Sequence, residues 1–275
     1  MDYPNTGFID GSGTSDLWLG GTIPHQTVIE NGDWRPYLPT AEKQADPTET
    51  MACVSFSNLS LLEIQHKQQT GIEPNWSDRF IAKLSGTTHS GNRFDVVADT
   101  VRKVGVVKQE DWPYVKGWDN FYTEIPQSVL NKAQKIEVMY EKITPVETEM
   151  MYHLKHAPLQ VSIKLPNPNH AVSLVYIEKG LAWYFDTYSP FLKTIPVSKI
   201  ARAFKIVLQT KEEKMKLVND KGTVYLVTGN KDKRKIGIAD LNSLGLFGDE
   251  PQIPMDTSGI KEYNTIVDAK TITHN

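Results

Sequence analysis

The 275-residue sequence predicts an α+β fold in which helices come first along the chain and strands follow. Before about residue 105, apolar residues recur three or four positions apart, which is typical of helices with one buried face. From residue 159 onward the pattern changes to short apolar or alternating runs of β-branched and aromatic residues, which favour strands. Helices and strands segregated in this way within one domain indicate an α+β architecture.

The first predicted helix spans residues 50–68, where Thr50 can cap its start and Gly71 can end it. Its apolar positions recur at steps of three, at Phe56, Leu59 and Leu62. Similar spacing predicts further helices at 78–84, 94–104, 128–135 and 146–156. Residues 105–127 are expected to form a loop.

Three strands are predicted at 159–165, 171–177 and 181–187. Turn residues separate them, first at 166–169 and then at Lys179-Gly180, so the last two strands are expected to form an antiparallel pair. A helix at 197–204 and a strand near 204–209 are expected to complete the domain.

The chain is expected to divide into three parts. Residues 1–32 lack sustained periodicity and predict an extended arm, and a charged run near 211–216 separates the main domain from a small β-rich module. In that module, strands near 223–228 and 234–238 are predicted around a polar turn at 229–233. The predicted parts are 1–32, 33–212 and 213–275.

Composition excludes several classes of function. Hydrophobic residues make up 39% and the formal net charge is −3, so we expect a packed core and no electrostatic attraction to nucleic acid. No apolar run approaches the roughly 20 residues of a membrane helix, and no secretory signal is evident at the start of the sequence. We therefore expect no membrane insertion.

Cys53 is the only cysteine, which rules out disulfides within the chain and a structural zinc site built on several thiolates. A lone cysteine is either an inert packing residue or a reactive thiol. Cys53 is predicted to lie in the first turn of its helix, where the partial positive charge of the helix N-terminus favours a thiolate.

A reactive thiol needs a base, and His170 is the best placed of the seven histidines because it opens a strong strand directly after a turn. In an antiparallel pair turning at Lys179-Gly180, Asp186 comes out roughly opposite His170 and can orient its ring. The alternative is that His170 is a structural turn residue. His153 and His156 could bind a metal, but no third ligand is evident, so neither a metal nor a cofactor is predicted.

Several segments in the right order resemble the papain-like cysteine peptidase family, over about residues 33–190. Cys53-Val-Ser-Phe-Ser57 is similar to the start of the family's catalytic helix, and Asn169-His170-Ala171-Val172 to its base segment. The other similar segments are Asp33-Trp34-Arg35 through Gln44, Gly91 through Tyr114, Ala157 through Ile163, and Trp183 through Ser189.

This resemblance implies a two-lobed fold, with a helical lobe that contains the cysteine and an antiparallel β lobe that contains the histidine. It implies that Cys53 attacks the peptide carbonyl, that His170 moves the proton, and that Asp186 orients His170. Gln44 would stabilise the oxyanion together with the backbone N–H of Cys53. Tyr188 would shield the His170–Asp186 hydrogen bond, and Tyr188 and Asn169 would border the substrate.

The sequence departs from the family in three respects. Asp186 stands where an asparagine is usual, and Tyr188 stands where a tryptophan is usual. Gln44 lies nine residues before Cys53, in a longer loop without the family's glycines and cysteine.

Three functions remain open. The first is hydrolysis of a polypeptide substrate, the second is transglutaminase-like acyl transfer, and the third is a non-catalytic structural or binding component, for example of a phage particle. The module at 213–275 loosely resembles β-rich modules of bacterial surface and phage proteins, and it could dock a partner. A cytoplasmic or virion-associated location is expected.

Overall fold

The structure is a computed structural model that describes residues 8–9, 29–46, 48–164 and 169–209, together with the backbone of five strands between 216 and 268. The chain divides into two compact units, Met1–Gln209 and Thr210–Asn275, and each is described by itself. The predicted N-terminal arm, residues 1–32, lies largely outside the described residues.

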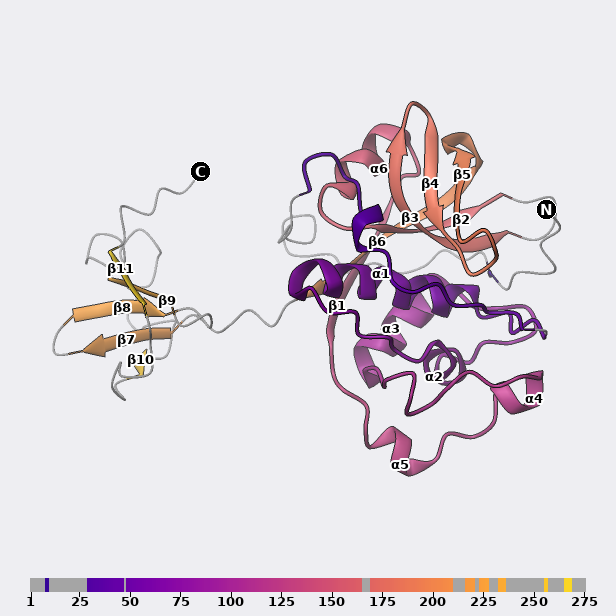
Figure 1. The fold of residues 1–275 in the computed structure, drawn as a ribbon, viewed down its shortest axis with the longest axis horizontal. Helices are drawn as coiled ribbons and strands as arrows, with labels where there is room; N and C mark the ends of the chain where they lie inside the picture. The colour runs from indigo at the N-terminus through magenta and orange to yellow at the C-terminus, as the bar shows by residue number, and fades with distance from the viewer. Residues whose placement is uncertain are drawn as a thin grey trace. The chain divides into compact units, whose positions relative to one another are not determined.

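The central element of the first unit is helix α1 (Cys53–Thr70), labelled in Figure 1. Nearly every residue in its first thirteen positions is buried, which is the expected behaviour of a helix that is enclosed on all sides. The helix ends at Gly71, whose φ of 73° lies in the left-handed region that glycine adopts without strain. The predicted helix is therefore confirmed, but it begins three residues later than expected.

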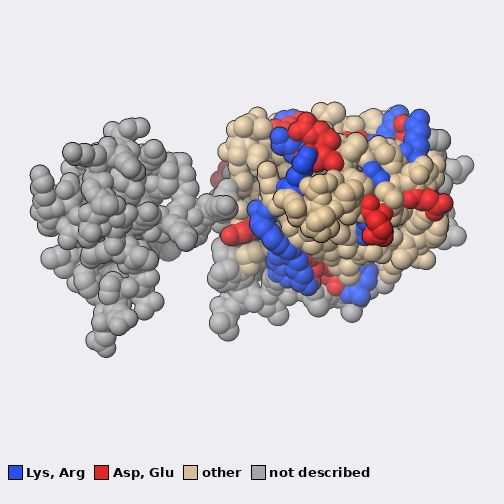
Figure 2. Space-filling model, turned by 90° about the horizontal axis from the view of Figure 1, so that it is seen from below, with Lys and Arg blue, Asp and Glu red and all other residues tan. Residues whose placement is uncertain are grey.

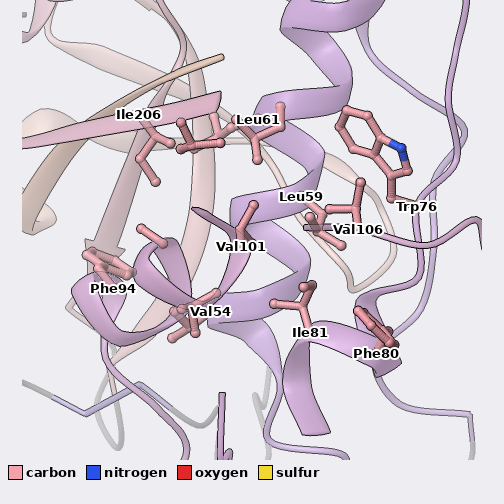
Figure 3. Close-up of a cluster of buried hydrophobic side chains, with 14 of the residues drawn as sticks. Val54, Leu59, Leu61, Trp76, Phe80, Ile81, Phe94, Val101, Val106 and Ile206 are labelled. Atoms are coloured by element: carbon pink, nitrogen blue, oxygen red, sulfur yellow. The ribbon is translucent and has the colours of Figure 1, made fainter. Parts of the chain in front are cut away.

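Apolar side chains from several helices pack around α1 and form one core (Figure 3). Figure 3 labels Val54, Leu59, Leu61, Trp76, Phe80, Ile81, Phe94, Val101, Val106 and Ile206. The contributing helices α2 (Asp78–Leu84) and α3 (Phe94–Val104) have the predicted bounds. The remaining helices are η1 (Arg35–Tyr37), α4 (Trp118–Phe121), α5 (Gln127–Leu130), α6 (Glu147–Leu154) and η2 (Val197–Lys199).

A six-stranded sheet forms the other part of this unit, with the order β1-β6-β2-β3-β4-β5 and antiparallel pairing throughout. The predicted strands correspond to β2, β3 and β4. This arrangement confirms the predicted α+β class. The strands are β1 (Glu137–Ile143), β2 (Leu159–Ile163), β3 (His170–Glu178), β4 (Leu181–Phe185), β5 (Leu192–Pro196) and β6 (Ile200–Gln209).

Two strands were not predicted, and one predicted helix is wrong. Strands β1 and β5 were missed, and residues 197–204, predicted as a helix, form the short η2 and the start of β6. β6 is held as a strand because it pairs with β1 on one side and with β2 on the other. Its Lys205 is fully buried and forms an ion pair with Glu141 of β1 at 2.6 Å. Tertiary pairing here overrides local helix propensity.

The second unit contains a five-stranded sheet with the order β10-β7-β8-β9-β11. β7, β8 and β9 are antiparallel neighbours, whereas β10 and β11 pair in parallel at the two edges. The predicted second strand begins earlier than expected, because β9 includes part of the predicted turn. The strands are β7 (Lys216–Asp220), β8 (Thr223–Val227), β9 (Asp232–Lys235), β10 (Met255–Asp256) and β11 (Thr265–Asp268).

Surface charge in the described part of the first unit is mixed on the face in Figure 2, where Lys and Arg lie among Asp and Glu. A face with both signs interspersed presents no broad field of one sign. Among the helices that the structure describes, none is both long and apolar enough to cross a membrane.

Candidate active site

Cys53 is the first residue of α1 and is fully buried. The residue before it, Ala52, is the N-cap, and its carbonyl accepts hydrogen bonds from the amides of Ser55 and Phe56 at 2.9 and 3.1 Å. The predicted capping role of Thr50 is therefore wrong. The Thr50 hydroxyl donates instead to the carbonyl of Gln44 at 2.8 Å, so it fixes the preceding loop rather than the helix.

Buried hydrogen bonds fix the first turn of α1 against the sheet. The Gln160 side chain on β2 donates to the Val54 carbonyl at 2.8 Å and to the Ser57 hydroxyl at 2.7 Å. The Ser173 hydroxyl on β3 donates to the Ser57 carbonyl at 3.1 Å. The position of Cys53 is thus determined by both the helix and the strands that face it.

His170 and Asp186 form the pair that the sequence predicts. The distance between His170 Nε2 and Asp186 Oδ1 is 2.7 Å, and both side chains have no exposed surface. His170 is the first residue of β3 and pairs with Ile163 of β2, while Asp186 directly follows β4. The Thr187 amide also donates to Asp186 Oδ1 at 2.7 Å.

The charge state of Asp186 follows from its partners. Burial raises the pKa of a carboxyl group, but here the hydrogen bond and charge of His170 and the ammonium of Lys193 outweigh burial, so the pKa of Asp186 is lowered. Asp186 is therefore an anion at neutral pH. An anion in contact with Nε2 favours the tautomer and orientation in which Nδ1 faces away from Asp186.

Cys53 lies against the start of β3. The residue after His170, Ala171, contributes a backbone hydrogen bond to the Cys53 thiol, which lowers the pKa of that thiol. Burial raises this pKa by more, and the negative charges of Glu49 and Asp186 raise it further, so the pKa of Cys53 lies well above its ordinary value. Burial of Cys53 therefore favours the neutral thiol over the thiolate.

Gln44, the predicted oxyanion donor, is fully buried but is already bonded to the chain itself. Its Nε2 donates to Glu49 Oε1 at 2.6 Å, and its Oε1 accepts from the Thr187 hydroxyl at 2.8 Å. The Met51 amide donates to the same Glu49 oxygen at 2.8 Å, and Met51 has a φ of 57°, which is unusual for a residue with a side chain.

Residues 44–46 and 48–52, here called the Glu49 loop, lead into α1 and are held by tyrosines from other segments. The Tyr122 hydroxyl donates to the Thr50 carbonyl at 2.5 Å. The Tyr114 hydroxyl accepts from the Asp46 amide at 3.2 Å. A backbone bridge between Ala45 and Glu49 closes the loop on itself. These described residues are therefore held in place by specific contacts.

Tyr188 connects the histidine to the Glu49 loop. Its ring centroid lies 5.4 Å from that of His170, with an angle of 62° between the two planes. Its hydroxyl donates to the second carboxylate oxygen of Glu49. Burial and the neighbouring charge of Glu49 raise the pKa of Tyr188, so the phenol stays protonated. Asn169 precedes His170 and is partly buried.

The predicted absence of a metal site remains a prediction, since the structure tests it only in part. His153 is buried, with Nδ1 3.9 Å from Glu141 and Nε2 4.0 Å from Glu149. Within residues 8–9, 29–46, 48–164 and 169–209, no three His, Cys, Asp or Glu side chains form a group that could hold a metal ion.

Two residues of this site were missed by sequence reasoning. Glu49 was not singled out, and its only signal was the unusual spacing of Gln44 and Cys53. Lys193 donates to Asp186 Oδ2 at 2.7 Å. The sequence did contain a signal for Lys193. Asp186 stands where the family has asparagine, and a buried carboxylate is stable only beside a cation or other strong partner.

No family model and no curated protein sequence matches the chain. Among solved structures, xylellain, a cysteine protease from Xylella fastidiosa, matches with a TM-score of 0.60 and 13% identity, covering 75% of this chain and 97% of that one. Digestive procathepsin L 3 of Tenebrio molitor matches with a TM-score of 0.54 and 14% identity, covering 74% and 76%. Bromelain from Ananas comosus, solved with the inhibitor E64, matches with a TM-score of 0.51 and 17% identity, covering 64% and 98%.

These matches show that the chain has a papain-like fold, as the sequence resemblance implied.

Proposed function

We propose that this protein is a cysteine peptidase that hydrolyses peptide bonds through Cys53, His170 and Asp186. The observation that supports this most is the buried His170–Asp186 pair at 2.7 Å, in a papain-like fold, beside the strand residue whose backbone contacts Cys53. A histidine oriented by a carboxylate next to a helix-start cysteine is the arrangement that nucleophilic catalysis by sulfur requires.

In the proposed reaction, His170 takes the proton of the Cys53 thiol, and the sulfur attacks the carbonyl carbon of the scissile peptide bond. The tetrahedral intermediate collapses when His170 gives that proton to the leaving amine nitrogen, which leaves a thioester on Cys53. A water molecule, deprotonated by His170, then attacks the thioester and releases the carboxylic acid. Asp186 holds the imidazole ring throughout.

Hydrolysis by this route requires the Glu49 loop to change its contacts. The Gln44 Nε2 has two N–H groups, and one of them donates to the Glu49 carboxylate at 2.6 Å, so the negative charge of Glu49 lies against the amide that would bind a substrate oxyanion. Cys53 must also become accessible, because it has no exposed surface in this form. We therefore propose that substrate binding displaces Glu49 from Gln44.

The second candidate is a non-catalytic protein with a papain-like fold. The observation that favours it is the complete burial of Cys53, which raises the pKa of its thiol. A buried cysteine with a raised pKa is usually inert. Acyl transfer to an amine is a third candidate and would use the same three side chains.

A peptidyl vinyl sulfone distinguishes these candidates. We expect a single adduct on Cys53 at pH 7, located by peptide mass spectrometry, and no adduct in Cys53→Ala. Modification only above about pH 8.5, as for an ordinary thiol, would support the non-catalytic protein. Incubating an acyl donor peptide with a primary amine separates the two enzymatic candidates, because acyl transfer incorporates the amine whereas hydrolysis releases an acid.

A further inference from the structure

Lys193 is a buried lysine at a strand position where burial alone would favour an apolar side chain. It is the one buried residue of the edge strand β5, whereas the neighbouring Leu192 is exposed. Lysine is almost never fully buried unless it is paired. The partner of Lys193 is Asp186, with Nζ 2.7 Å from Oδ2, and the side chains of the two residues are 5% and 0% exposed.

The two oxygens of Asp186 have separate tasks. Oδ1 accepts hydrogen bonds from His170 Nε2 and from the Thr187 amide, each at 2.7 Å. Oδ2 accepts from the Lys193 ammonium. The carboxylate is thus fixed from both sides, so its plane cannot turn without breaking a bond to a buried group. Lys193 also places a full positive charge on the side of Asp186 that faces away from His170.

We infer that Lys193 is a positioning residue that neutralises Asp186, so that the Asp186–Lys193 pair acts on His170 as an uncharged hydrogen-bond acceptor. This assignment rests on the proposed function. An isolated buried carboxylate in contact with an imidazole would stabilise the imidazolium strongly, whereas a carboxylate paired with an ammonium would do so much less. The Asp186–Lys193 pair would therefore replace, as an uncharged hydrogen-bond acceptor for His170, the single asparagine that papain-like peptidases usually have at this position.

The other charged and titratable groups around His170 come from two more elements. The Cys53 thiol, on α1, is bonded to the backbone of Ala171, the residue after His170, and Tyr188, bonded to Glu49, lies against the His170 ring. The Glu49 carboxylate therefore adds a second negative charge near this group of side chains. With Glu49 already present there, compensation of Asp186 by Lys193 keeps the histidine from being surrounded by two uncompensated carboxylates.

The test is a double-mutant cycle of Lys193→Met, Asp186→Asn and the combined variant, with two readouts. The first is the urea midpoint of unfolding. Asp186→Asn leaves the Lys193 ammonium buried without its anion, so we expect a large fall in the midpoint. Adding Lys193→Met to Asp186→Asn removes that charge, and we expect the double variant to regain more than half of the lost midpoint.

The second readout is the pH profile of Cys53 modification by the vinyl sulfone. Lys193→Met leaves Asp186 uncompensated, so the alkaline limb, which reports loss of the imidazolium, should move up by about half a unit to one unit. In the double variant it should return to within a few tenths of the wild-type position. Lys205→Met is the matched control, because it removes another buried lysine, paired with Glu141, and should lower stability without moving the limb.

Additive effects on the urea midpoint, or an alkaline limb that Lys193→Met leaves in place, would overturn the inference. Failure of the proposed function is a separate outcome. If the wild-type protein shows no modification of Cys53 at neutral pH, the peptidase assignment fails, while the urea cycle still measures whether Lys193 and Asp186 are coupled.

Discussion

The two halves of the candidate site differ in how their hydrogen bonds are used. On the sheet side, His170, Asp186 and Lys193 bond to one another, and none of these bonds has to break during hydrolysis. On the loop side, Gln44 bonds to Glu49, which is a contact that a substrate would have to replace. The groups on the sheet side are thus already in the arrangement that the proposed reaction needs. On the loop side, the Gln44 amide is bonded to the Glu49 carboxylate.

For the proposed peptidase, this difference predicts which steps each half of the site would affect. Groups held on strands keep their geometry at no cost during the reaction, which is the condition for effective acid–base catalysis. A loop whose donor is already occupied must first exchange partners. Changes on the sheet side should therefore affect the chemical step, and changes on the loop side should affect access to it.

The largest effect is expected from His170→Ala. Without the base, modification of Cys53 by the vinyl sulfone at pH 7 should fall by about 10³-fold, because a positioned base contributes roughly 10²–10⁴-fold. The rate is measured by mass spectrometry of intact protein over time. His156→Ala serves as the control, since His156 lies beyond the end of α6 and outside the site. Equal rates for the two variants would refute the assigned pairing.

A smaller loss is expected from Gln44→Ala, because removal of one oxyanion donor typically lowers turnover by about 10²–10³-fold. The loss should appear in peptide hydrolysis, which forms an oxyanion, and much less in modification by the vinyl sulfone. The matched variant is Thr187→Val, which removes only the hydroxyl that donates to Gln44 Oε1. If Gln44→Ala hydrolyses peptides as fast as the wild type, the loop half has no catalytic donor at this position.

How much of this site the sequence predicts depends on which half is considered. His170 and Asp186 were found because strand pairing follows from alternation and from the turn at Lys179-Gly180. Glu49 could not be found, because its contact with Gln44 depends on how a loop folds, and loops have no periodicity that fixes their side chains. Gln44 was recognised by its position in the sequence, but its hydrogen bond to Glu49 was not predicted.

The two strands missed in the first unit, β1 and β5, share a physical feature, which is a buried charge. Strand β5 has Lys193 inside and Leu192 outside, and β1 and β6 bury the ion pair of Glu141 and Lys205. A method that counts apolar positions assigns such residues to the surface, so the pattern of each strand is hidden. Helices α2 and α3 have the predicted bounds, whereas α1, which is buried on all sides, begins three residues later than predicted.

A gain rather than a loss is expected from Glu49→Ala. Removing the carboxylate breaks the contacts of Glu49 with Gln44 and Tyr188 and removes a charge that raises the pKa of Cys53. Modification of Cys53 at pH 7 should therefore become about ten times faster, which corresponds to roughly 1.4 kcal/mol. Asp46→Ala, in the same loop, is the control because only the backbone amide of Asp46 contacts Tyr114. A slower rate in Glu49→Ala would mean that Glu49 supports the active form.

The smallest effect concerns stability and compares Asp186 with Glu63, a second buried carboxyl group, which lies on α1. The Glu63 carboxylate accepts from the Trp76 amide at 2.6 Å. Burial raises the pKa of Glu63 to about 8, and the charges of Glu42 and Glu73 act in the same direction. Asp186, with the His170 and Lys193 cations beside it, has its pKa lowered instead.

The two groups should therefore respond to pH with opposite signs. Between the ordinary pKa of 4.5 and about 8, the native protein holds a proton on Glu63 that the unfolded chain has lost, so the free energy of unfolding falls as pH rises. Asp186 instead contributes stability above its ordinary pKa of 3.8 and loses it as pH falls below that value.

Glu63→Gln keeps an acceptor for the Trp76 amide and removes the titration. We expect it to raise the free energy of unfolding at pH 8 by about 1–2 kcal/mol relative to pH 5, measured by urea denaturation at both values. Glu124→Gln is the control, since the Glu124 side chain is 92% exposed and does not contribute to the raised pKa of Glu63. A Glu63→Gln variant with the same slope against pH as the wild type would show that a buried carboxyl group in this fold needs no cation to remain ionised.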